Sequence, residues 1–215
     1  MSVNDKQAVE CCIQDGDLSK LLRLPQNLDD FSEACIIKSV DWILQLNEQQ
    51  IEEGTKDLQE ADIEAGVPWA QHSVKSPFTN RKCFILNGMM SRKFSPQFLQ
   101  EEVRAMSFDS VLILIQYLQF LLMWSSVQED DQPIPSLEQV IHWLNALIDS
   151  HFQQLKLAED ADEVIVSLHQ QITHMAHWQQ ECKALQGMLA ELNRKFEEQQ
   201  KSTKIGDYCI EVISF

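Results

Sequence analysis

The chain has 215 residues, of which 44% are hydrophobic and 23% charged, and its formal net charge is −16. This length allows a true hydrophobic core, while six Gly and six Pro are too few for the turns of a many-stranded sandwich or barrel. An acidic surface also argues against strong binding of nucleic acid by the chain as a whole. We therefore predict an all-α protein, an irregular helical bundle with a long carboxy-terminal helix and a short terminal β-strand.

Residues 1–47 form the first predicted unit, an N-terminal helical segment. Its first helix should run from Asp17 to Leu24, because Asp17 is a good N-cap and Pro25 cannot continue the hydrogen-bonding ladder. The next helix should run from Asp30 to Leu46. That stretch has almost no polar face, which predicts burial on several sides.

Residues 48–75 are predicted to be an acidic linker. The sequence from Asn47 to Gly66 is rich in Glu, Gln and Asp and has few large apolar side chains. Such a stretch cannot bury much surface, so it is typical of a solvated linker or of a frayed helix extension.

Residues 76–205 form the predicted main helical domain. Ser76 before Pro77 and Ser95 before Pro96 both match an N-cap followed by proline in the first helical position, which predicts two helices interrupted near Gly88. Serine 107 then starts an apolar helix that reaches Trp124. Its apolar run is shorter than the roughly 20 residues that cross a bilayer. We therefore expect no membrane span but a buried helix, or one that buries itself against a partner.

Two further helices follow in this domain. Ser136 and Gln139 form a capping box, and the stripe after them predicts that Trp143, Leu144 and Leu147 are buried. A longer helix is predicted from about residue 162 to 200. Its apolar residues recur at steps of three and four, with one extra step of three near Trp178.

The pattern of the long helix predicts a narrow, heptad-like seam with local overwinding. Its partner is either the helix after Ser136 of the same chain, packed antiparallel, or a helix of another molecule. The seam residues are Ile165, Leu168, Ile172, Met175, Trp178, Cys182, Leu185, Leu189, Leu192 and Phe196.

Residues 206–215 are predicted to be a terminal strand or tail, because apolar side chains alternate there by two. An unpaired strand needs an edge to complete, and addition to a sheet of a partner protein would supply one. The alternative is an extended strap folded back on the helices. The predicted docking residues are Tyr208, Ile210, Val212 and Phe215.

A basic island interrupts the acidic sequence, since no acidic residue lies between Val67 and Gln100. Phenylalanines are interleaved with its cations. The island is either an ordinary solvated surface or a patch that contacts RNA phosphates, and five charges make only a modest footprint for the second interpretation. The cations are Lys75, Arg81, Lys82, Arg92 and Lys93.

No motif for catalysis or cofactor binding is present. The chain contains neither a glycine-rich phosphate loop nor a nucleophile elbow. Its six cysteines show no zinc or redox spacing, and His169, His174 and His177 share a helix face without a further ligand that would complete a metal site. We therefore predict no catalytic residue, cofactor, metal or small-molecule substrate, leaving an enzyme with an unrecognised site as a second alternative.

Two segments resemble the carboxy-terminal region of the nucleolar protein 11 family, IPSLEQVIHWLNALIDSHF at 134–152 and DYCIEVISF at 207–215. The resemblance is best over residues 133–215, weaker over 17–46, and not visible between 47 and 100. It implies a subunit of the small-subunit processome in the nucleolus, within the nucleus, supporting pre-rRNA transcription and processing. A β-propeller precedes the helical region in that family and is absent here, which suggests a fragment, a short isoform or a divergent relative.

The resemblance therefore implies a non-enzymatic helical scaffold that docks onto other protein subunits of the processome, with weak pre-rRNA contact as an additional expectation. The first alternative is a helical adaptor subunit of an unrelated intracellular complex. Neither interpretation involves a membrane.

Overall fold

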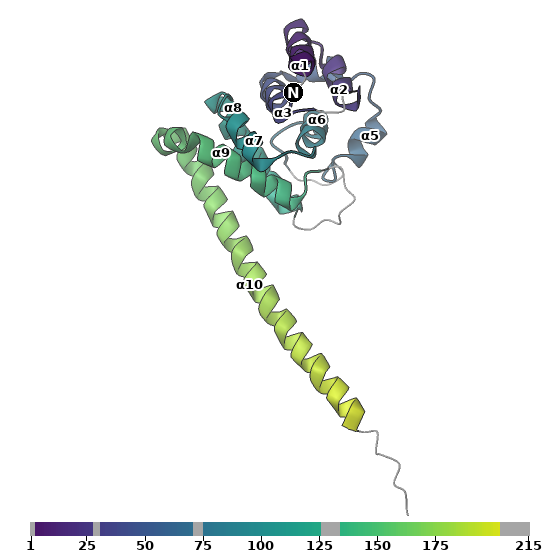
Figure 1. The fold of residues 1–215 in the computed structure, drawn as a ribbon, viewed down its shortest axis with the longest axis vertical. Helices are drawn as coiled ribbons and strands as arrows, with labels where there is room; N and C mark the ends of the chain where they lie inside the picture. Colours follow the sequence, from purple (N-terminus) through teal and green to yellow (C-terminus); the bar gives the residue numbers. More distant parts are fainter. Residues whose placement is uncertain (1–2, 28–30, 71–74, 126–133, 203–215) are drawn as a thin grey trace, which may run out of the picture. The chain divides into compact units, whose positions relative to one another are not determined.

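The computed structural model describes residues 3–27, 31–70, 75–125 and 134–202, and the regular elements in these ranges are all helices (Figure 1). The all-α prediction is therefore confirmed, while the predicted terminal strand at 206–215 lies outside the described residues. In chain order the elements are α1 (Val3–Asp15), α2 (Leu18–Asn27), α3 (Glu33–Gln45), α4 (Glu48–Gly54), α5 (Glu60–Ala65), α6 (Asn80–Met90), α7 (Pro96–Val103), α8 (Phe108–Ser125), α9 (Leu137–Leu157) and α10 (Glu159–Ser202).

The chain divides into two compact units, Met1–Ile165 and Val166–Phe215. The first unit holds α1 to α9 and the start of α10, and the second holds the rest of α10. The boundaries predicted at residues 47/48 and 75/76 do not coincide with this division, because helices on both sides of them pack together within the first unit.

Helix α3 is the centre of the first unit and contacts α1, α6, α7 and α8. Its residues Ile36, Val40 and Ile43 have no solvent exposure. A helix with apolar side chains on nearly all sides needs neighbours all round it, so the predicted burial of this segment is confirmed.

The amino-terminal helices differ in part from the prediction. Asp17 caps α2 as expected, since its Oδ1 accepts a hydrogen bond from the Lys20 amide at 2.9 Å. The helix continues through Pro25 to Asn27. Proline removes one amide donor but does not force the following residues out of helical dihedrals, so the predicted end was wrong. Helix α1 was not predicted at all; it buries only small side chains such as Val9 and Cys12.

The range 48–75, for which the sequence predicted a solvated acidic linker or a frayed helix extension, contains two short helices where the structure describes it. Helices α4 and α5 lie in that range, and both contact α6. Asn47 forms a capping box with Gln50, and each helix anchors one buried isoleucine, Ile51 or Ile63. A short helix can be stabilised by a cap and one buried apolar side chain. A low density of apolar residues therefore does not exclude helices in this range.

The start of α6 differs from the prediction, whereas the start of α7 agrees with it. The N-cap of α6 is Thr79, not Ser76, whose hydroxyl instead lies 3.2 Å from the Cys83 sulfur. Helix α6 runs through Gly88, and the next helix starts at Pro96 after the N-cap Ser95, as predicted. A glycine in a helix interior weakens it without ending it.

Helix α9 closes the first unit by contacting α7 and α8. The predicted capping box of Ser136 and Gln139 is present, and Trp143, Leu144 and Leu147 are buried, so both predictions are confirmed. Helix α8 buries one side, including Val111, Leu114, Leu118 and Leu121, while Ile113 and Met123 are exposed. Within the described residues, no helix combines the length and the apolar character that a bilayer span requires.

We expect Leu147→Ala to lower the free energy of unfolding by about 2–5 kcal/mol, because it leaves a cavity beneath α9. Ile141→Ala on the same helix is the matched control, since Ile141 is 43% exposed and its loss should cost under about 1 kcal/mol. Urea denaturation followed by circular dichroism measures both. Equal losses in the two variants would contradict the assignment of Leu147 to the core.

Candidate interaction surfaces

Among the cations of the basic island, Lys82 differs most from the exposed position that the sequence suggested. Its side chain is only 8% exposed, and its Nζ donates to the carbonyl oxygens of Leu44 at 2.9 Å and Leu46 at 3.0 Å. It therefore caps the carboxyl end of α3, where carbonyls lack helical partners and a positive charge is favourable. The ammonium also lies 5.1 Å from the centroid of the Phe78 ring, and burial lowers the pKa of Lys82.

Arg81 and Arg92 likewise bind groups within their own unit. Arg81 donates to the carbonyl and the hydroxyl of Thr55, both at 3.1 Å, and forms an ion pair with Glu60. Arg92 donates to the carbonyl of Pro25 at 3.3 Å, and its guanidinium stacks over the Phe31 ring. Much of the donor capacity of these two side chains is thus used inside the fold.

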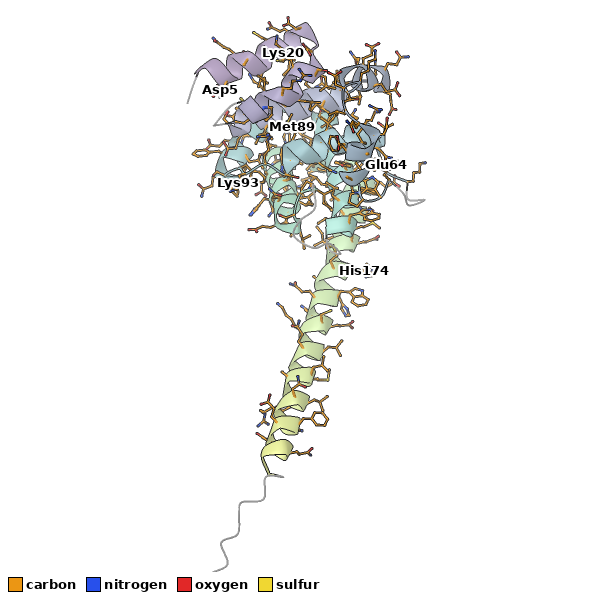
Figure 2. The ribbon with its side chains drawn as sticks, turned by 90° about the vertical axis from the view of Figure 1, so that its right-hand side faces the viewer. Asp5, Lys20, Glu64, Met89, Lys93 and His174 are labelled. Carbon is orange, nitrogen blue, oxygen red and sulfur yellow. The ribbon has the colours of Figure 1, made fainter. Side chains whose placement is uncertain are left out.

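Lys75 and Lys93 are the members of the island that are exposed, as Figure 2 shows for Lys93. The sequence carried a signal for the different role of Lys82, because Lys82, Leu86 and Met89 share one face of α6 at helical spacing. Leu86 and Met89 are buried, so a lysine in line with them points toward the core.

A buried polar cluster links α6 to α8. The Tyr117 hydroxyl lies 2.7 Å from the Asn87 Oδ1 and 3.4 Å from the Cys83 carbonyl oxygen, and burial raises the pKa of Tyr117 well above its ordinary value. The amide of Asn87 also donates to the carbonyl of Gly66 at 3.5 Å. The cluster thus joins α6 to α8 and reaches the carbonyl of Gly66 at the end of α5.

Elsewhere on the first unit, an open hollow is lined by consecutive residues 149–154 of α9. The hollow lies where His151 departs from helical dihedrals. In the part of the chain that the structure describes, no group of three or more His, Cys, Asp or Glu side chains could hold a metal ion. The predicted histidine face of α10 is exposed, as Figure 2 shows for His174.

The second unit carries most of the apolar seam of α10. Leu168 at its start is only 3% exposed, but the seam is largely uncovered from Ile172 onward. Large apolar side chains along it are between 45% and 68% exposed, although side chains of this size are normally buried. Figure 2 shows side chains projecting from the helix beyond His174. The exposed seam residues are Ile172, Trp178, Leu185, Leu189, Leu192 and Phe196, and Met188 is exposed beside them.

The polar side of the same helix is held by ion pairs between neighbouring turns. Arg194 binds Glu191 at 2.7 Å and Glu198 at 2.8 Å. Pairs at this spacing favour the helix by only a few tenths of a kcal/mol each, so they do not replace the missing burial of the seam. The other predicted docking residues, Tyr208, Ile210, Val212 and Phe215, lie outside the described residues.

Comparison with known proteins agrees with the resemblance of the two quoted segments. A family model described as the nucleolar protein 11 C-terminal domain matches residues 6–215. The chain is 30% identical over 145 residues to a nucleolar protein 11-like protein of Danio rerio, covering 65% of this chain and 20% of that protein. It is 21% identical over 134 residues to nucleolar protein 11 of Xenopus laevis, covering 60% of this chain and 19% of that protein. The chain thus spans about a fifth of each relative.

Replacing Lys82 by Met, which has a similar volume, should destabilise the first unit by about 1–3 kcal/mol, because the carbonyls of Leu44 and Leu46 lose a buried donor. Lys93→Met removes the same charge from an exposed position and should change stability by less than about 0.5 kcal/mol. Thermal and urea denaturation of both variants test this. A Lys82→Met protein as stable as the parent would show that the cap contributes nothing.

Proposed function

Because the chain belongs to the nucleolar protein 11 family, through a C-terminal domain that matches residues 6–215, we propose that it acts in the nucleolus in ribosome biogenesis. Its role there is that of a non-enzymatic helical scaffold in the small-subunit processome, where it supports pre-rRNA transcription and processing. Family membership is the observation that carries this proposal.

The scaffold role is supported by where apolar surface remains uncovered. The seam of α10 presents large side chains at helical spacing, as in helices that recognise another protein through one face. The buried polar groups of the first unit, such as Tyr117 and Asn87, instead make contacts within the fold. Other protein subunits of the processome are therefore the proposed partners, and small-molecule substrates and membranes are not.

Affinity purification with mass spectrometry, combined with imaging of the tagged chain, tests the proposal. Recovery of several processome subunits and nucleolar fluorescence are the expected results. Recovery of a different and reproducible intracellular complex would favour the helical adaptor alternative. A turnover activity of the purified chain that survives denaturation and refolding would favour the enzyme alternative.

Deleting Gly206–Phe215 tests the proposed docking role of Tyr208, Ile210, Val212 and Phe215. If this tail adds a strand to a sheet of a partner, the shortened protein should keep its melting temperature and lose recovery of the complex. Replacing the tail by a Gly/Ser segment of equal length controls for chain length. A clear drop in melting temperature would instead assign the tail to the fold as a strap.

Weak contact with pre-rRNA is the second part of the proposal, and its candidate residues are the exposed Lys75 and Lys93. Lys75→Glu combined with Lys93→Glu should reduce retention on pre-rRNA 5′ fragments. The slope of the logarithm of the binding constant against the logarithm of the salt concentration should become shallower by about 0.7 for each phosphate contact that is lost. Lys56→Glu combined with Lys156→Glu changes the charge equally at exposed positions outside the island.

Equal loss of binding in the two double variants would mean that only net charge matters, which would overturn a specific role of the island. Lys82 is left unchanged in this experiment because its substitution disturbs the fold. Circular dichroism of both double variants should match that of the parent.

A further inference from the structure

We propose that α10 of one copy pairs with α10 of a second copy, in antiparallel orientation, through the seam from Trp178 to Phe196. This pairing goes beyond the proposed function, and it uses the same seam of α10 that supports the proposed scaffold role.

Beyond Leu168, none of the described side chains of α10 is buried. Trp178, Leu185, Leu189 and Phe196 are each more than half exposed. Helices in proteins owe most of their stability to packing of an apolar face, so this length of exposed helix is expected to find a partner helix.

The seam follows a regular heptad pattern after the overwound step. Cys182, Leu189 and Phe196 occupy one core position of the heptad, and the other core position is filled at Trp178, Leu185 and Leu192. About three heptads in succession are at the lower limit for a coiled coil, which is consistent with a reversible pair and not with a permanent one.

Antiparallel pairing places unlike core residues in the same layer. Leu185 of one copy meets Leu189 of the other at the centre, on both sides of the twofold axis. Cys182 then faces Leu192, and Trp178 faces Phe196. The small thiol opposes a branched leucine, and the two aromatic residues meet at the ends, where their rings can extend beyond the layer.

The residues that flank the core decide the orientation. Glu181, Met188 and Lys195 occupy the same heptad position on one side of the seam. In the antiparallel pair, Glu181 lies opposite Lys195 of the second copy, and the symmetry repeats this ion pair. Met188 meets its own counterpart near the axis, where its 57% exposed side chain gains burial.

The opposite flank is uncharged, so it opposes neither orientation. Gln179, Gln186 and Asn193 occupy it. A parallel pair would place Glu181 beside Gln186 and Met188 beside Asn193, and would gain no ion pair from Lys195. The charge pattern of the helix is therefore complementary to itself only when the second copy runs in the opposite direction.

The present partners of the two flanking charges do not prevent this exchange. Lys195 lies 3.9 Å from Glu191, and Glu181 lies 3.6 Å from the ring of His177, in pairs that are more than 45% exposed on each side. Exposed pairs of this kind are weak, and both long side chains can reorient toward a second helix.

Sedimentation equilibrium of the full chain, residues 1–215, is the first test. We expect a concentration-dependent equilibrium between monomer and dimer, and its loss in the variant Leu185→Asp/Leu189→Asp. Ala184→Asp/Ala190→Asp introduces the same charge on exposed positions outside the seam and should leave the equilibrium unchanged. A parent protein that stays monomeric up to high micromolar concentration would overturn the proposal.

Charge exchange tests the orientation. Lys195→Glu alone, or Glu181→Lys alone, creates two repulsive contacts and should weaken the dimer about tenfold at low ionic strength. The double variant Glu181→Lys/Lys195→Glu restores both ion pairs and should recover the parent affinity. Absence of that recovery would contradict antiparallel pairing.

A disulfide test gives an independent readout of orientation, in a background carrying Cys11→Ser and Cys209→Ser. In an antiparallel dimer the two copies of Cys182 lie about 15 Å apart along the axis, so mild oxidation should not link them. Adding Leu192→Cys should produce a covalent dimer. Ready cross-linking through Cys182 alone would instead establish parallel pairing and overturn the proposal. Cys12, Cys35 and Cys83 are buried and do not interfere.

Discussion

The burial of α3 is the constraint on which the rest of the first unit depends. Because this helix is apolar on nearly all sides, α1, α6, α7 and α8 must all pack against it. Its carboxyl-terminal carbonyls are then removed from water, and each would be a costly unsatisfied acceptor. Lys82 on α6 supplies the missing donor by hydrogen bonding to the carbonyls of Leu44 and Leu46 at the end of α3.

The same need accounts for the other cations of the basic island. Arg81 reaches the carbonyl at the end of α4, and Arg92 reaches the carbonyl of Pro25 near the end of α2. A region without acidic residues therefore supplies donors to helix ends contributed by an acidic part of the chain. Lys75 and Lys93 are the members of the island that remain exposed.

Helix α10 also carries an apolar face, and such a face favours burial. Its seam is apolar and periodic, as the interior helices are, yet most of its large side chains from Ile172 onward are exposed. Apolar surface of this kind is typical of a contact with another protein. The chain belongs to the nucleolar protein 11 family, for which we propose contacts with other protein subunits. The charges beside the seam indicate that a second copy of this helix is also a suitable partner.

Local chemistry in the sequence determined the helical class, the caps at Asp17 and Ser136, the start of α7 at Pro96, and the seam of α10. Each of these signals is complete within a few residues, because capping bonds and helical periodicity join near neighbours. Tertiary structure decided which stretches with few apolar residues are ordered, and which cations serve the fold. Ile51 is buried on a helix that packs against both α2 and α6, and Lys82 binds carbonyls 38 and 36 residues away. Burial of a single residue by a distant element leaves no periodic pattern, so it could not be predicted from the sequence alone.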